Sequence, residues 1–270
     1  MAVIPRELLQ QGNHQLHFKL LLNGPFGSGK TYKAMTFPKW AYAMWEPNGI
    51  MTARTSPELL SNMVYYESFL PSNDEDIKQT FLRYDAFLKQ ARKDAQEGKI
   101  ETVIVDNLTH QLEARWLYIE KYEKSFGKGG EVDTRGMYGT LGRWAFRSTV
   151  LDLLSIPCHI VLTCHITDEK KSDPKTGQQY ETGKIISDTL GNFRKEVSGL
   201  FNAALFLDLK REPVNGKTVY HYLARCLPSA GIEAKNNLGL PEIVENISYQ
   251  TLVACLPKLN GAQVNGEGKA

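Results

Sequence analysis

The sequence predicts an α/β fold, in which a mostly parallel sheet is flanked by helices and ends in an antiparallel C-terminal hairpin. Short apolar segments alternate with segments of helical length through most of the 270 residues, and this alternation is typical of a parallel sheet covered on both faces. Near the C-terminus, two apolar runs flank the turn signal Val214-Asn215-Gly216, which predicts an antiparallel pair. We find no linker or internal repeat, and expect one domain over 16–256 between flexible tails at 1–15 and 257–270.

Composition places the chain among ordinary soluble globular proteins. Hydrophobic residues make up 42% and charged residues 23%, which is close to average usage. No apolar run approaches the roughly 18 residues of a membrane helix, and the N-terminus lacks the pattern of a signal peptide, so we expect a cytoplasmic protein without a membrane partner. The net charge of +2 does not indicate nucleic acid by itself, so such a partner would need local basic patches.

The first elements are two strands on either side of a short helix. LHFKLLLN at 16–23 is an apolar run ended by Gly24-Pro25, which predicts a buried strand followed by a turn. KTYKAMTF has helical length before Pro38 stops it. WAYAMW at 40–45 is an aromatic-rich second strand that ends at Glu46-Pro47-Asn48-Gly49.

The middle of the chain continues the alternation. Helices are predicted over about 57–69 and 73–97, because Gly98 closes the second and polar residues open it. The β-branched ETVIVDN at 101–107 predicts a strand that ends in an acid. Further expected elements are a helix over 108–125, a glycine-rich break, a helix to about 155, the strand HIVLTCH at 159–165, a polar segment over 166–190 and the hairpin strands at 200–209 and 218–227.

The turn after the first strand matches the phosphate-binding pattern G-x-x-x-x-G-K-[ST] at every fixed position. Its glycines let backbone N–H groups turn inward around phosphates, the helix N-terminus adds its dipole, Lys30 reaches the outer phosphates, and Thr31 offers a hydroxyl to Mg²⁺. The alternative is a glycine-rich turn with a surface lysine. The predicted ATP-binding residues are Gly24, Pro25, Phe26, Gly27, Ser28, Gly29, Lys30, Thr31 and Tyr32.

Asp106 is the second expected ligand of the metal site. It ends the buried strand TVIVD, and ligands of open α/β sheets bind at the carboxyl ends of the strands. Asp106 would therefore hold Mg²⁺ through water, together with Thr31.

These motifs resemble P-loop NTPases, and further residues resemble the RecA-like branch. There, a glutamate at the end of the strand after the phosphate-loop helix activates the attacking water, and Glu46 stands at that point. Asp106 and Asn107 are rival positions, and a solvated acid at a strand end is the alternative for Glu46. HIVLTCH resembles the strand whose last polar residue senses the outer phosphate, so Thr163 or His165 would have that role, with His165 preferred over a structural histidine.

A C-terminal segment resembles the K-x-R-x-G element with which ring-forming RecA-like ATPases reach the neighbouring subunit's nucleotide. Lys235 and Gly239 match it, but Asn237 stands where the arginine is expected. An amide carries no charge to offset the transition state. Lys235 alone, or Arg225 as a substitute, is then the candidate, and a plain surface lysine is the alternative.

The order of motifs over residues 16–250 resembles phage-encoded RecA-like ATPases that bind single-stranded DNA and support annealing and recombination. The resemblance implies ATP and Mg²⁺ as cofactors, hydrolysis that Asn237 would slow, and assembly into a ring or filament. It also implies single-stranded DNA as a partner, a single-strand binding protein as a possible further one, and a location in the host cytoplasm.

A basic segment over 114–147 and a second loop over 166–186 are the candidate DNA surface, since the resemblance places DNA-lining loops at both. The first holds seven basic and four acidic residues among aromatic ones, as strand-tracking by charge and base stacking requires. The second is neutral overall, and solvated helices with a flexible loop are the alternative for both. The candidate DNA-binding residues are Lys124, Lys128, Arg135, Lys170 and Lys171.

Two other functions remain open at this point. A replication motor or helicase loader would use the same core, although the sequence shows no additional helicase-like domain. A small-molecule kinase would need an arginine-bearing lid over the phosphates. No lid insertion is evident, but Arg143 and Arg147 lie on a predicted helix and are candidates for that role.

Overall fold

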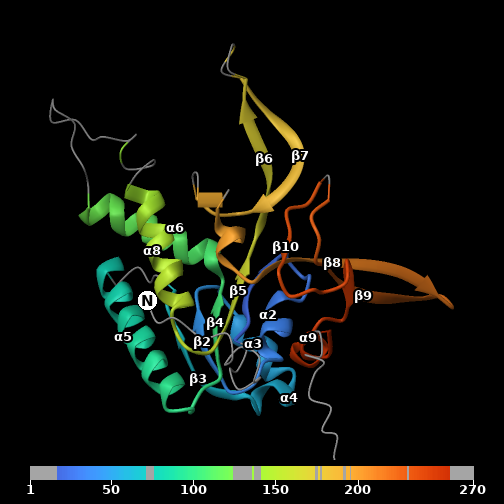
Figure 1. Ribbon diagram of the computed structural model, residues 1–270, viewed down its shortest axis with the longest axis horizontal. Helices are drawn as coiled ribbons and strands as arrows, with labels where there is room; N and C mark the ends of the chain where they lie inside the picture. Colours follow the sequence, from blue (N-terminus) through green and yellow to red (C-terminus); the bar gives the residue numbers. More distant parts are fainter. Residues whose placement is uncertain are drawn as a thin grey trace, which may run out of the picture.

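The computed structural model describes residues 17–70, 76–123, 136, 141–173, 176, 178–190, 193–194, 196–229 and 231–255 (Figure 1). Its strands are β1 (Lys19–Asn23), β2 (Trp40–Met44), β3 (Met63–Ser68), β4 (Thr102–Asp106), β5 (His159–Cys164), β6 (Ile166–Ser172), β7 (Gln179–Ser187), β8 (Ala203–Val214), β9 (Lys217–Arg225), β10 (Lys235–Asn236) and β11 (Ile243–Glu245). Its helices are α2 (Lys30–Met35), α3 (Gly49–Arg54), α4 (Pro57–Leu60), α5 (Ile77–Gln96), α6 (Leu108–Tyr122), α8 (Gly142–Leu154), the 3₁₀ turn η3 (Val197–Leu200) and α9 (Tyr249–Cys255).

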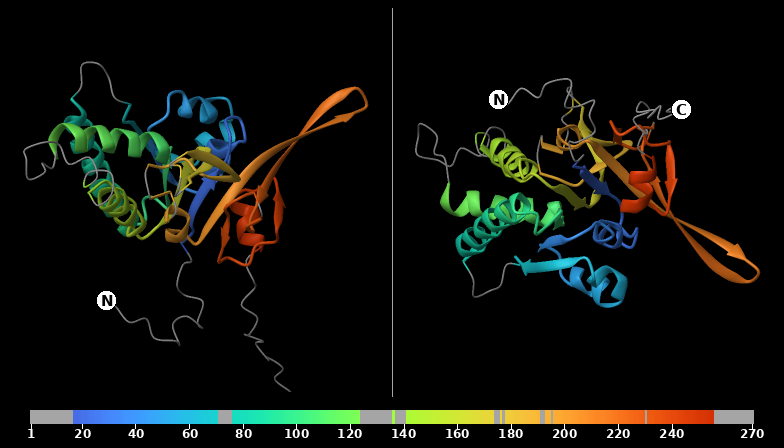
Figure 2. Two further views of the ribbon diagram at one scale, coloured as in Figure 1. Left: turned by 90° about the horizontal axis from the view of Figure 1, so that it is seen from above. Right: turned by 60° about the horizontal axis from the view of Figure 1, so that its bottom comes forward.

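One large mixed sheet organises these elements. Its strand order is β11-β9-β8-β1-β5-β4-β2-β3, with β10 paired to β8. Neighbours from β8 to β3 are parallel, whereas β9, β10 and β11 are antiparallel additions. The predicted fold class, a mostly parallel sheet flanked by helices with an antiparallel C-terminal hairpin, is therefore confirmed, and the hairpin is β8–β9, which extends far from the sheet (Figures 1 and 2).

Apolar side chains project from both faces of the parallel strands, so helices cover both faces of the sheet. Leu21 of β1 lies in one buried cluster with residues of α5, α6 and α8. Leu20 and Leu22 point the other way, into a cluster with residues of α2, α3 and α9. The alternation along a strand thus divides the core into two layers, and Figure 1 shows the two groups of helices on opposite sides of the sheet.

The parallel arrangement gathers the loops after β1, β2, β4 and β5 at one edge of the sheet. The strand β5 lies between β1 and β4, and the register pairs Asn23 with Cys164. Met44 is likewise paired with Asp106. The residues that follow these four strands are therefore neighbours in space although they are far apart in the sequence.

The structure corrects two expectations about secondary structure. The predicted helix over 57–69 is the short helix α4 followed by strand β3, whose aromatic and β-branched residues pair with β2 at the sheet edge. The segment 166–190, expected to be only a polar stretch, contains the hairpin β6–β7. Its exposed strands give no apolar alternation from which a hairpin could be inferred.

The predicted helix over 73–97 corresponds to α5, where Asp76 accepts a hydrogen bond from the Lys78 backbone N–H at 2.9 Å as the N-cap. Within the described residues, no helix is long and apolar enough to cross a membrane. The proposed tails at 1–15 and 257–270 lie outside the described residues.

Candidate active site

The phosphate-binding pattern forms a loop between β1 and α2. Gly29 precedes the helix with φ 84°, and Gly27 has φ 76°. Glycine adopts such left-handed conformations without the steric cost that most side chains add there. A side chain at Gly29 would also meet the ring of Tyr222 at 3.2 Å. The loop therefore has the backbone geometry that lets its N–H groups face a bound anion.

Lys30 is buried against this loop. Its Nζ donates to the carbonyl oxygens of Gly24 and Pro25 at 2.8 and 2.9 Å. Burial lowers the pKa of its ammonium group, and the carboxylates of Asp106 and Glu46 partly offset that effect. A phosphate bound in the loop would be a stronger, anionic acceptor for the Lys30 ammonium group than these two neutral carbonyl oxygens.

Asp106 is held by hydroxyl groups from three elements. Its Oδ2 accepts hydrogen bonds from Thr31 Oγ1 and Tyr42 Oη, each at 2.8 Å, and its Oδ1 accepts one from Thr163. Burial, followed by the nearby Asp106, raises the pKa of the Tyr42 phenol far above its ordinary value, so that group remains a donor. The structure thus brings the two predicted metal-site residues together, and their oxygens are the ligand type that Mg²⁺ prefers.

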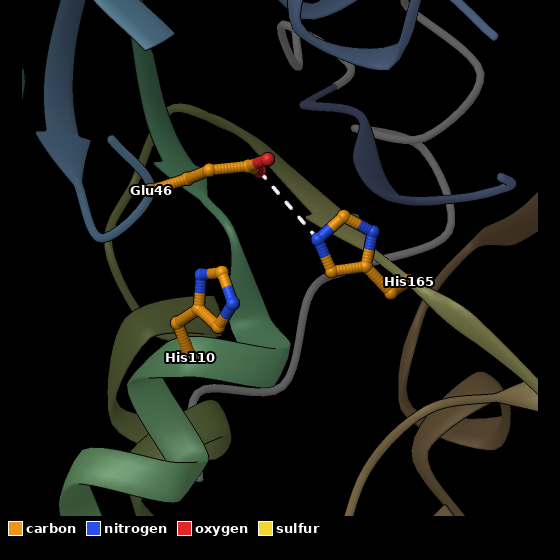
Figure 3. A group of neighbouring side chains, drawn as sticks. All are labelled: Glu46, His110 and His165. Atoms are coloured by element: carbon orange, nitrogen blue, oxygen red, sulfur yellow. Dashed lines mark ion pairs between the residues drawn. The ribbon is translucent and has the colours of Figure 1, made fainter. Parts of the chain in front are cut away.

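Glu46, Asn107 and His165 form a second group beside the loop, and Figure 3 shows the Glu46 and His165 side chains of this group. Asn107 Nδ2 donates to Glu46 Oε2 at 2.6 Å and to His165 Nε2 at 2.8 Å. Burial, with Lys30 and then His110 as further causes, lowers the pKa of His165 to about 4. The imidazole is therefore neutral near pH 7, and the predicted base and sensor are connected through one amide.

Aromatic contacts surround this second group. The ring of Phe26, in the loop, lies 4.2 Å from the ring of His165, and His110 lies 5.6 Å from it, measured between centroids. A cavity of about 230 Å³ opens next to them. Its lining residues are Phe26, Gly27, Gly29, Lys30, Thr31, Tyr32, Glu46 and Thr52. The cavity thus joins the phosphate loop to the candidate base.

The other predicted residues lie elsewhere. Lys235, on the edge strand β10, donates from Nζ to the Gly199 carbonyl at 2.7 Å. Lys170 and Lys171 lie on β6, which begins one residue after His165. Lys124, Lys128 and Arg135 fall outside the described residues.

Three contributors to the site escaped the sequence reasoning: Tyr42, His110 and the bridging role of Asn107. A tyrosine inside a fully buried strand needs a partner for its hydroxyl, so Tyr42 could have been suspected from its position in WAYAM. Asn107 is the N-cap of α6 and accepts from the His110 backbone N–H at 2.9 Å. That cap orients the Asn107 amide, and no spacing in the sequence reveals its two further partners.

Comparisons with known proteins identify one family. A family model described as an AAA domain matches residues 17–238. No curated protein matches the sequence. An ATPase from the type III secretion system of pathogenic bacteria is 11% identical with a TM-score of 0.47, and the alignment covers 71% of this chain and 51%, about half, of that one. A KaiC-like protein from the archaeon Pyrococcus horikoshii is 16% identical with a TM-score of 0.41, and 80% of this chain and 82% of that one are covered.

Proposed function

The chain belongs to the AAA domain family, and from this premise we propose that it is a RecA-like ATPase that binds single-stranded DNA in phage recombination or annealing. One observation carries the proposal. Two groups meet at the phosphate loop, a Thr31–Asp106 pair suited to a metal ion and a Glu46–Asn107–His165 group suited to water activation and sensing. The second group leads directly into the hairpin β6–β7.

Binding of the nucleotide would use the loop and its lysine. Lys30 would exchange the carbonyls of Gly24 and Pro25 for outer phosphate oxygens, and the loop N–H groups would bind the remaining ones. Thr31 and Asp106 would hold Mg²⁺, which neutralises developing charge on the phosphates when bound. Tyr42 and Thr163 keep the Asp106 carboxylate oriented toward Thr31.

Glu46 is the proposed general base. Its side chain lines the cavity beside Lys30 and Thr31, where a water next to the outer phosphate would lie. His165 shares the Asn107 amide with Glu46, so a movement of His165 on contact with phosphate would release or restrain the base.

The hairpin β6–β7 is the proposed DNA-binding element. His165 immediately precedes it, and the hairpin projects from the body of the molecule (Figure 1). Lys171 lies directly opposite Tyr180 in the antiparallel pair, and the Tyr180 side chain is exposed. A cation next to an exposed ring on one face of a ribbon suits a phosphate and a stacked base. Phosphate-dependent movement of His165 would change the position of this face.

DNA binding is tested by fluorescence anisotropy with a labelled single-stranded oligonucleotide, with and without a non-hydrolysable ATP analogue. Tyr180→Ala should weaken binding by about 1–3 kcal/mol, roughly 5- to 150-fold. Lys171→Ala should reduce the slope of log affinity against log salt by about 0.7. Tyr220→Ala is the matched control, because Tyr180 and Tyr220 are each 52% exposed and Tyr220 lies on the other hairpin.

Two results would contradict the DNA proposal. One is an equal loss in the Tyr180→Ala and Tyr220→Ala variants. The other is no binding to single strands at low salt in any nucleotide state. Directional unwinding coupled to ATP consumption would instead favour a motor, and transfer of phosphate to a metabolite would favour a kinase.

Hydrolysis is tested separately with Glu46→Gln. This variant should still bind ATP, because Lys30 and the loop are unchanged, while the rate of phosphate release falls by about 10²–10⁴-fold, as expected when a general base is lost. An unchanged rate would exclude Glu46 as the base.

Self-assembly into a ring or filament, with Lys235 reaching a neighbouring nucleotide, is part of the proposal. It is tested by imaging the Lys235→Ala variant with the non-hydrolysable ATP analogue and single-stranded DNA.

A further inference from the structure

Three metal-ligating side chains converge at the mouth of the site. Glu46 follows β2, His110 lies in the first turn of α6, and His165 follows β5 (Figure 3). One ligand atom from each lies within 4.8 Å of the others. Glu46 Oε2 and His165 Nε2 are 3.7 Å apart.

The contact between Glu46 and His165 is not an ion pair near pH 7. His165 Nε2 and Glu46 Oε2 each accept a hydrogen bond from Asn107 Nδ2, so two acceptor lone pairs converge on that one amide nitrogen. The lowered pKa of His165, about 4, keeps the ring neutral. The two side chains are only 9% and 22% exposed, so water screens these lone pairs weakly, and the Asn107 amide holds them together. A cation that took the place of this amide group would bind both lone pairs.

His110 is the third candidate ligand, and among the described residues no hydrogen bond holds its Nδ1 atom. Within the residues that the structure describes, Nδ1 of His110 is buried without a hydrogen-bond partner, and so is Nδ1 of His165. The ring of His110 faces that of His165 edge to face. A small rotation of His110 is therefore not opposed by a hydrogen bond at Nδ1.

We propose that Glu46, His110 and His165 form a binding site for a zinc-type divalent cation, distinct from the Mg²⁺ position at Thr31 and Asp106. Two imidazoles with one carboxylate are a common zinc ligand set, whereas Mg²⁺ takes oxygen ligands. Zinc–nitrogen bonds of about 2.0–2.1 Å place tetrahedral ligands roughly 3.4 Å apart. The observed 3.7 Å already approaches this value, and His110 would close the remaining gap.

Occupation of this site would regulate the proposed ATPase. Coordination takes the lone pairs of Glu46 and His165 that now accept from Asn107, so it withholds the base from water while leaving Lys30 and the loop unchanged. This regulatory part rests on the proposed function. Binding of the cation does not, because it needs neither nucleotide nor hydrolysis.

The test measures zinc binding to the full chain, stripped of metal and without nucleotide, by competition with a chromophoric chelator. The wild type should bind one equivalent at this site, and His110→Ala should lower the affinity at least tenfold, since even outer partners of metal ligands contribute about 10- to 100-fold. His221→Ala is the matched control, because His221 also contacts carboxylates, those of Glu245 and Glu212. It should leave the affinity unchanged.

Equal zinc affinity in the wild type and His110→Ala would overturn the site, and so would a loss in His221→Ala as large as in His110→Ala. Co²⁺ provides a readout that needs no variant, since four-coordinate Co²⁺ bound by nitrogen and oxygen ligands absorbs visible light, and absence of that absorption would also overturn it. Zinc should then slow phosphate release several-fold more in the wild type than in His110→Ala, each relative to its own zinc-free rate. Zinc binding that depends on His110 without this inhibition would overturn the regulatory part alone.

Discussion

Replacement of Gly49 by alanine is expected to destabilise the protein, although glycine-to-alanine changes in helices usually stabilise by about 0.4–1 kcal/mol. Gly49 is the first residue of α3. A Cβ there would lie 2.0 Å from Tyr42 Oη and 3.2 Å from Asp106 Oδ2. The Tyr42 side chain is fully buried and donates to Asp106, so it cannot move aside while keeping that hydrogen bond.

The magnitude follows from these contacts. Loss of a hydrogen bond to a charged group costs about 1.5–3 kcal/mol, and forcing an extra methyl group into a packed region costs about 1–3 kcal/mol. After subtraction of the usual gain, Gly49→Ala should lower the free energy of unfolding by about 2–5 kcal/mol. Gly199→Ala is the control, because a Cβ at Gly199 meets no atom within 4 Å. It should be neutral or slightly stabilising.

The coupling between positions 42 and 49 is measured by urea unfolding of Gly49→Ala, Tyr42→Phe and the Tyr42→Phe/Gly49→Ala double variant. Gly199→Ala is unfolded in the same way as the control. Tyr42→Phe alone should cost about 1.5–3 kcal/mol. It also removes the atom that the new methyl group meets, so the double variant should be more stable than the sum of the single effects by at least about 0.5 kcal/mol. Strict additivity, or a Gly49→Ala variant as stable as Gly199→Ala, would refute the reasoning.

Two further predictions concern pH and the loop. Burial, with His17 as the next cause, lowers the pKa of His159 from 6.5 to about 4. Between these two pH values the unfolded chain binds a proton that the folded chain does not. The free energy of unfolding should therefore fall as pH drops from 6.5 toward 4, by up to about 1.4 kcal/mol per pH unit for this residue. His159→Gln should reduce that slope in urea titrations at several pH values, and an unchanged slope would contradict the assignment. Gly29→Ala should lower the free energy of unfolding by about 1–2 kcal/mol, because the backbone of Gly29 is left-handed. Adding Tyr222→Ala removes the ring that the new methyl group meets but should not restore wild-type stability. Full recovery would show that the ring contact alone is responsible.

The predicted site residues that the structure brings together are those that depend on short-range spacing or on an unambiguous strand end. The residues from Gly24 to Thr31 form one local motif, and Asp106 ends a strand whose composition is unambiguous. Tyr42 was missed because its link to Asp106 depends on how β2 lies beside β4, which is set by tertiary pairing. The hairpin β6–β7 was missed for a related reason, since both of its strands are largely exposed and carry no apolar pattern.

The two carboxylates of the site are held very differently, and this difference supports the roles proposed for them. Asp106 is fully buried and accepts from three hydroxyl groups on three separate elements, so its position is fixed by the packed sheet. Among the described residues, the Glu46 carboxylate receives its hydrogen bond from Asn107, whose amide is also bonded to His165. A carboxylate fixed by several donors is preorganised for the Mg²⁺ position, whereas a carboxylate held by one amide can exchange that amide for a water molecule or another ligand. Asp106 therefore suits the Mg²⁺ ion and Glu46 the water. Any ligand that separates His165 or Glu46 from the Asn107 amide, whether a phosphate that moves His165 or a cation that replaces the amide, changes how free Glu46 is to move.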